Sequence, residues 1–154
     1  HPALEVFFDE ILGTPKTGER LIGLYEKAFP ALRDALRRYA GESHPLADQP
    51  SIRLCRMALL DLEDICRWGA EAVRCLVPAE ERKQSAHWYS LLDICLAAAG
   101  GLDGSDPAAE KTTAPLRHYS SAFFLLRDQS GGSRAVIPEI PVKSFTKKTI
   151  QSVP

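Results

Sequence analysis

The chain has 154 residues, which suits a single domain that buries roughly 70% of its unfolded surface without disulfides or structural metals. Its formal net charge of −1 offers no general attraction to nucleic acid or to an anionic membrane, so neither is expected as a partner. No apolar run approaches the roughly 20 residues that would span a bilayer.

A short helix is predicted at the start of the chain. The i, i+3, i+4, i+7 spacing of one apolar helix face is followed by Leu4, Phe7, Phe8 and Ile11. The sequence Gly13-Thr14-Pro15 should end this helix. His1-Pro2 lacks the charged segment and apolar run of a signal peptide, so none is expected. Because the first residue is His1 and not Met, we expect a domain taken from a longer protein or a chain whose start has been removed.

A second helix is predicted from about Thr17 to Tyr39, with Pro30 inside it. Proline lacks a backbone N–H and its ring collides with the carbonyl four residues earlier, so Pro30 should kink or split the helix. The apolar face of this helix consists of Leu21, Leu24, Tyr25, Ala28, Leu32, Ala35, Leu36 and Tyr39.

Three more helices are predicted beyond a loop at residues 41–50. The third runs from about Pro50 to Leu76. The fourth runs from about Pro78 to Ala99, where Gly100-Gly101 ends it. The fifth starts near Ala108 or Ala114 and ends at Asp128. This pattern predicts an all-α fold, an antiparallel helical bundle of four to five helices over residues 1–128.

Residues 129–154 have a different character, with glycines, prolines and no helical period. Their basic residues are Arg134, Lys143, Lys147 and Lys148. We expect an extended basic tail or linker here, with a basic contact arm as the alternative.

All four cysteines lie in predicted helices, and no two of them form a Cys-x-x-Cys pair: Cys55, Cys66, Cys75 and Cys95. A disulfide framework is therefore not expected. Reduced thiols imply a reducing compartment, hence the cytoplasm. A regulatory thiol is the alternative interpretation.

Three carboxylates interrupt the apolar run of the third helix. Its predicted core face consists of Leu54, Ala58, Leu62, Ile65, Gly69, Ala72 and Leu76, with Trp68 and Val73 at the edges. Asp61 falls within this face and Asp64 on its flank. Glu63 points to solvent, where it can pair with Arg67 one turn later. A buried carboxylate needs a partner, so we expect an arginine or tyrosine beside Asp61, with a ligand or substrate contact as the alternative.

No other helix directs an acidic side chain toward Asp61. A di-iron bundle needs a carboxylate from each of two helices and a Glu-x-x-His from each of two others. His87 and His118 lie on the flanks of their predicted helices, so no metal and no cofactor are expected. The candidate buried polar or ligand contacts are Asp61, Asp64, His87 and His118.

The segment HPLADQPSIRLCRMALLDLEDICRWG, residues 44–69, resembles part of a bacterial ferritin-like helical family, and the resemblance reaches back to about Arg20. In that family a similar loop leads into a helix that carries Glu-x-x-His near its middle and then Trp-Gly. Aligned on Trp68-Gly69, the two ligand positions hold Leu62 and Ile65. The resemblance implies a ferritin-like bundle whose metal site is filled by aliphatic side chains.

The sequence contains no phosphate-binding loop, no nucleophile elbow and no His-Glu-x-x-His motif. We expect a non-catalytic helical module that acts through homo-oligomerisation or through contact with a partner or a neighbouring domain. One alternative is a metal-dependent ferritin-like oxidase or hydroxylase, with di-iron or di-manganese held by flanking segments or by His44, His87 and His118. Another is a small-ligand site between bundle helices.

Overall fold

The structure is a computed structural model that describes residues 1–107 and 116–120. All regular structure in these residues is helical, so the predicted all-α fold is confirmed. None of the helices that they form combines the length and apolarity needed to cross a membrane. In chain order the helices are α1 (Pro2–Gly13), α2 (Thr17–Ile22), the π-helical segment η1 (Gly23–Ala28), α3 (Phe29–Glu42), α4 (Gln49–Leu76), α5 (Ala79–Gln84) and α6 (Ala86–Ala99).

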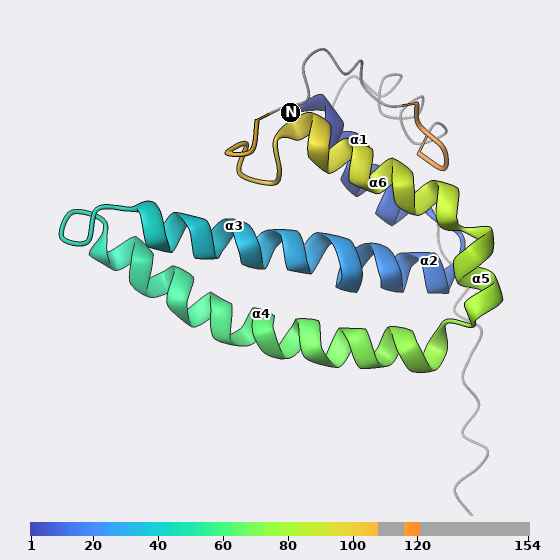
Figure 1. Ribbon diagram of the computed structural model, residues 1–154, viewed down its shortest axis with the longest axis horizontal. Coiled ribbons are helices and arrows are strands. Elements are labelled where there is room, and N and C mark those ends of the chain that lie inside the picture. Colours follow the sequence, from blue (N-terminus) through green and yellow to red (C-terminus); the bar gives the residue numbers. More distant parts are fainter. Residues whose placement is uncertain (108–115, 121–154) are drawn as a thin grey trace, which may run out of the picture.

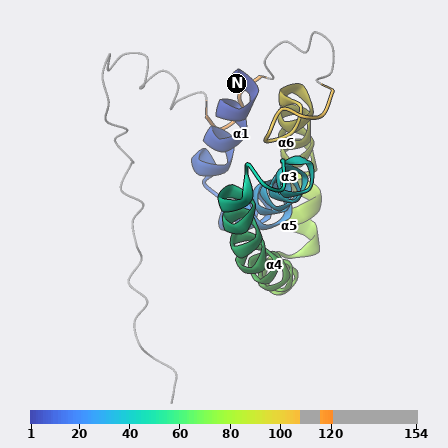
Figure 2. The same cartoon turned by 90° about the vertical axis from the view of Figure 1, so that its left-hand side faces the viewer.

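A rod made of α2, η1 and α3 lies in the middle of the molecule (Figure 1). It forms a hairpin with α4, while α1 and α6 lie side by side on the opposite side of the rod (Figure 2). The α1–α6 pair contacts α2 and η1, so the far end of the α3–α4 hairpin extends beyond it. One long side of α4 therefore packs within the molecule, and its other sides face outward.

The interruption predicted at Pro30 takes the form of a π-helical segment within a continuous rod: α3 begins at Phe29, with Pro30 in its first turn. The segment η1 precedes it, and the Phe29 N–H bonds to the Leu24 carbonyl, five residues earlier. This wider turn gives the proline ring room beside the preceding carbonyls, so one rod continues from α2 into α3. Gly23 lets η1 approach its neighbours closely, because a Cβ there would lie 2.9 Å from Ile11 Cγ1 and 3.1 Å from Trp88 Cη2.

The main hydrophobic core lies where α1, η1 and α6 meet. It contains Val6, Phe7, Ile11, Ala28, Trp88, Leu91, Leu92 and Cys95. The buried face of α1 is turned relative to the prediction: Phe8 is exposed and Leu4 half-buried, while Ala3, Val6 and Glu10 are buried. A buried glutamate therefore occupies the core-facing side of this helix.

The packed face of α4 also differs from the predicted one. Its contact with the rod follows a heptad spacing, which we call the inner seam: Ile52, Cys55, Leu59, Leu62, Cys66, Gly69 and Val73. Leu54 and Leu76, assigned to the core from the sequence, are 68% and 66% exposed, whereas Val73 is fully buried. Apolar residues cover about half of the circumference of α4, so the sequence pattern alone does not reveal which part of that arc packs.

The predicted fourth helix consists of two pieces, α5 and α6, which meet at a break at Ser85. Gly100 ends α6 in the left-handed conformation (φ 74°), as predicted. The fifth predicted helix is wrong at residues 116–120, which form bends and a turn. Its remaining residues, and the predicted tail at 129–154, lie outside the described residues.

Gly69→Ala should lower the free energy of unfolding by about 1–3 kcal/mol, because the added Cβ would overlap the Tyr25 ring and lie 2.7 Å from its Cβ. Gly41→Ala in α3 is the matched control. No atom outside its own helix lies within 4 Å of that added Cβ, so its stability should hold or rise slightly. Chemical denaturation followed by circular dichroism measures both, and equal effects would contradict close packing of α4 on η1.

Candidate functional site

The structure places all four sequence-predicted site residues on the surface. Asp61 is exposed and makes no hydrogen bond or ion pair with a described residue, so the expected buried partner is absent. Asp64 is exposed and pairs with Arg67 (2.6 Å). Glu63 pairs with Arg37 of α3 (2.7 Å), and not with Arg67 as predicted. Asp61 and Asp64 therefore lie on the exposed surface of α4, and Glu63 lies at one edge of the α3–α4 hairpin.

The three histidines considered as metal ligands, His44, His87 and His118, lie in three different places. His87 is exposed near the start of α6. The exposed His118 ring packs edge-on against Tyr119, with centroids 4.2 Å apart. His44 Nδ1 accepts the backbone N–H groups of Leu46 and Ala47 in the loop between α3 and α4. Within residues 1–107 and 116–120, no group of three or more His, Cys, Asp or Glu side chains could hold a metal ion.

A buried carboxylate that the sequence interpretation missed lies at the centre of the α1–α6 layer. Glu10 is fully buried and accepts the indole N–H of Trp88 (3.1 Å). It also accepts the backbone N–H groups of His118, Tyr119 and Ser120 (2.7–3.0 Å) and the Ser120 hydroxyl (2.7 Å). Five donors therefore surround one carboxylate, and four of them tie residues 116–120 to α1.

The hydrogen bonds decide the charge of Glu10. Burial by itself would raise the pKa of this carboxyl, but the bonds from Ser120, Tyr119 and His118 outweigh it, and the pKa lies below its usual value of 4.5. The carboxylate is thus ionised at neutral pH with its oxygen lone pairs occupied. This state suits a structural anchor and not a proton acceptor in a reaction.

A second buried carboxylate, Glu19, joins α2 to α6. It accepts the hydroxyl groups of Thr14 (2.6 Å) and Ser85 and the ammonium of Lys16 (3.0 Å). The Tyr119 hydroxyl also donates to Glu19 (3.3 Å), and the Tyr119 backbone N–H donates to Glu10. Burial by itself would also raise the pKa of Glu19. The hydrogen bonds from Ser85, Thr14, Lys16 and Tyr119 outweigh burial and lower this pKa. Tyr119 therefore connects the two buried carboxylates, Glu10 and Glu19.

A sequence signal for Glu10 does exist. It falls three residues after Phe7 and next to Ile11, on the spacing of the buried face of α1. Its partners lie on α6 and in residues 116–120, far along the chain, so the spacing does not say how the charge is compensated. For Glu19, no apolar periodicity marks the short helix α2 as buried.

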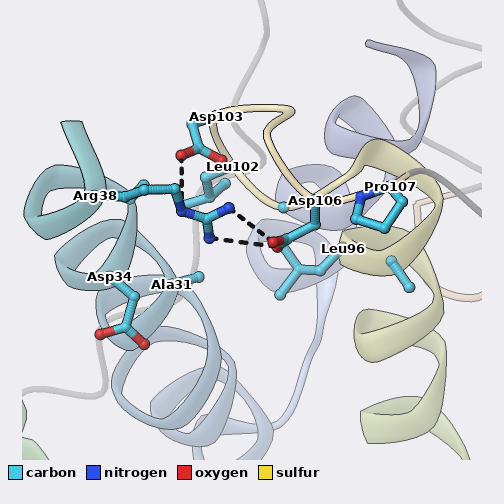
Figure 3. A pocket seen from close by; sticks show the side chains of 11 residues that line it. Ala31, Asp34, Arg38, Leu96, Leu102, Asp103, Asp106 and Pro107 are labelled. Carbon is cyan, nitrogen blue, oxygen red and sulfur yellow. Dashed lines mark hydrogen bonds and ion pairs between the residues drawn. The ribbon is translucent and has the colours of Figure 1, made fainter. Parts of the chain in front are cut away.

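An open groove of about 570 Å³ lies between α3 and the loop that follows α6. Arg38 reaches across it toward two carboxylates, Asp106 (2.7 Å) and Asp103 (3.5 Å), as Figure 3 shows. The hydrogen bond to Asp106 is the main reason that the pKa of Arg38 is raised. Because both carboxylates neutralise the guanidinium, the described residues of the groove offer no free cation to an anionic ligand. We interpret Arg38 as the residue that holds the loop to α3.

The thiols also differ in their surroundings. Burial raises the pKa of Cys95 to about 11, so this thiol stays protonated and unreactive in the core. Cys75 is exposed near the end of α4, where its thiol lies 3.5 Å from Glu71 Oε1. The four cysteines are free, and each lies on α4 or α6.

A second seam with heptad spacing runs along α4, about 100° around the helix from the inner seam. This outer seam consists of Leu54, Ala58, Asp61, Ile65, Trp68, Ala72 and Cys75. Each member is exposed or half-buried in the described structure, and Trp68 is 63% exposed. The Trp68 indole packs edge-on against Tyr25 (5.6 Å), which holds it on one side and leaves it open on the other.

The apolar surface continues from the outer seam onto its surroundings. Met57 and Leu76 flank it on α4, and both are exposed. Leu32 and Tyr39 are exposed on α3 and lie on the edge opposite Arg37, which pairs with Glu63 at the charged edge of the hairpin. Contiguous exposed apolar surface of this kind is typical of protein contact sites.

Comparison with known proteins adds no relative: the chain matches no protein-family model, no curated protein and no solved structure.

Glu10→Gln should lower the free energy of unfolding by about 2–3 kcal/mol, because a neutral amide presents its own N–H₂ group to donors that now surround a carboxylate. Glu42→Gln, an exposed glutamate at the end of α3, is the matched control and should have little effect.

The same pair of variants tests the charge of Glu10. Because its pKa is lowered by folding, its stabilisation is complete above pH about 4.5 and is lost as pH falls through the lower folded value. Urea denaturation across this range should therefore show a weaker pH dependence for Glu10→Gln than for wild type. An unchanged pH profile would contradict the assignment.

Proposed function

We propose that the chain is a non-catalytic helical module that acts through protein contact made by the outer seam of α4. The observation that carries this proposal is that α4 has two heptad seams but only the inner seam is covered by described residues. A helix with apolar residues on two faces is stable in water when each face has a partner. The inner seam packs against helices of this chain. The outer seam, in this proposal, packs against a second protein surface.

The polar groups of the described region support a contact role over a catalytic one. Glu10 and Glu19 have their oxygens occupied by donors and help to hold the fold. Arg38 is neutralised by two carboxylates. General acid–base work needs a group near its working pH with a free position for substrate, and these groups lack that position.

We also propose that the module is a ferritin-like bundle that has lost its metal function. The support is the resemblance of residues 44–69, in which Leu62 and Ile65 stand at the ligand positions. Leu62 is buried in the inner seam, and Ile65 is half-buried in the outer seam. Neither side chain can bind a metal. Four free cysteines are consistent with a reducing, cytoplasmic location, which is likewise a proposal.

Photo-crosslinking in the native cells tests the contact role. Leu54 in the outer seam and Leu60 on the charged side of α4 are both 68% exposed, so they form a matched pair of positions for a benzophenone side chain. Position 54 should yield a discrete adduct and position 60 should not. Trp68→Glu, about 21 Å further along the same seam, should abolish the adduct at position 54 while leaving the melting temperature near that of wild type.

Two outcomes of this experiment would overturn the proposal. Equal adducts at positions 54 and 60 would show that crosslinking follows exposure alone. An adduct at position 54 that survives Trp68→Glu would show that the seam does not act as one contact surface.

A further inference from the structure

Ile65 lies midway between two pairs of identical side chains on and beside the outer seam, of which Leu76 is the flanking member. Leu54 and Leu76 lie eleven residues to either side of Ile65, and Ala58 and Ala72 lie seven residues to either side. Asp61 and Trp68 lie four residues before and three residues after it. A two-fold interface brings the same surface of two copies together in reverse order, so its residues must complement one another about a centre.

We infer that the occupant of the outer seam is a second copy of this chain, packed antiparallel with the two-fold axis beside Ile65. This inference rests on the proposed contact function and names its partner. In this register, residues whose numbers add up to about 130 face each other. Leucine then meets leucine at both ends of a contact about 33 Å long. Alanine meets alanine at two intermediate points, where small side chains let the helices approach closely.

The one charged residue of the seam selects the antiparallel direction. In a parallel pair in register, the two Asp61 carboxylates would face each other and repel in a desolvated contact. In the antiparallel pair, Asp61 faces Trp68 of the second copy, whose indole N–H can donate to the carboxylate. Neither the Asp61 carboxylate nor the Trp68 indole makes an ion pair or hydrogen bond with a described residue. In the antiparallel pair the indole becomes the donor and the carboxylate the acceptor, and the two-fold axis produces this hydrogen bond twice.

The surface around the seam agrees with a dimer of hairpins. Leu32 and Tyr39 of α3 lie on the same edge of the hairpin and would extend the contact beyond α4. A stable interface needs roughly 800 Å² from each partner, more than one helix face alone supplies. Two α3–α4 hairpins facing each other would form a four-helix arrangement in which the outer seams take the place of a core.

Sedimentation equilibrium of the purified full chain tests the identity of the partner. We expect a mass twice the 17.0 kDa of one chain, with dissociation on dilution. Leu54→Glu and Trp68→Glu should each weaken dimerisation about 100-fold or more, with helicity unchanged in circular dichroism. Leu60→Glu, the matched control of equal exposure, should leave the dimer intact.

Disulfide crosslinking tests the direction and the register. Ile65→Cys should crosslink at the axis, and Leu54→Cys should crosslink with Cys75 of the second copy and lose this crosslink when Cys75→Ser is added. Wild type should not crosslink, because antiparallel packing keeps the two Cys75 residues about 30 Å apart. Cys55 and Cys66 are half-buried in the inner seam, on the side of α4 that packs against its own chain. Arg67→Cys on the charged side is the control and should not crosslink either.

Each contrary result has a definite meaning. A Cys75–Cys75 crosslink in wild type would overturn the antiparallel register. A purified chain that is monomeric at all dilutions would overturn the inference. If position 54 then still gave an adduct that Trp68→Glu abolishes in cells, the contact function would stand with a different partner. If that adduct were absent too, both proposals would fall.

Discussion

The buried carboxylate of Glu10 is the constraint on which the arrangement of the described residues depends. It lies in the middle of the α1–α6 layer, where an unpaired charge would be too costly to bury, so the surrounding chain must bring donors to it. Trp88 supplies one from α6, and residues 116–120 supply the others. The need to satisfy a single charge therefore holds this distant segment against α1. Tyr119 also donates to the second buried carboxylate, Glu19. Glu19 links α2 with Ser85 at the break between α5 and α6.

The α1–α6 layer packs against one side of the α2–η1–α3 rod, and α4 packs against the opposite side. Gly23 and Gly69 permit two close approaches, one toward the α1–α6 layer and one from α4 toward Tyr25. This packing covers the inner seam, and the outer seam remains on the surface with Asp61 near its middle. The exposed apolar residues of the outer seam are thus a consequence of how few described helices are available to cover α4.

Much of the helical framework follows from local rules. The extent of α4, the left-handed glycine that ends α6 and the stop after α1 were predictable, because each depends on proline, glycine and apolar spacing within a few residues. The π-helical turn before Pro30 was not predictable, because proline allows a kink, a split or a widened turn, and packing against Ile11 and Trp88 selects among them. The bends at 116–120 were missed because hydrogen bonds to Glu10, and not local propensity, hold that segment.

The candidate site shows the same division. By itself the sequence determined that α4 is a long helix with apolar residues over half of its surface, that Asp61 interrupts them, and that no common catalytic motif is present. The tertiary structure decided which apolar face is buried and which carboxylates are. It turned Asp61 outward and Glu10 inward, because burial depends on where neighbouring helices lie. Periodicity reports the presence of an apolar arc, but only packing decides which part of that arc loses contact with water.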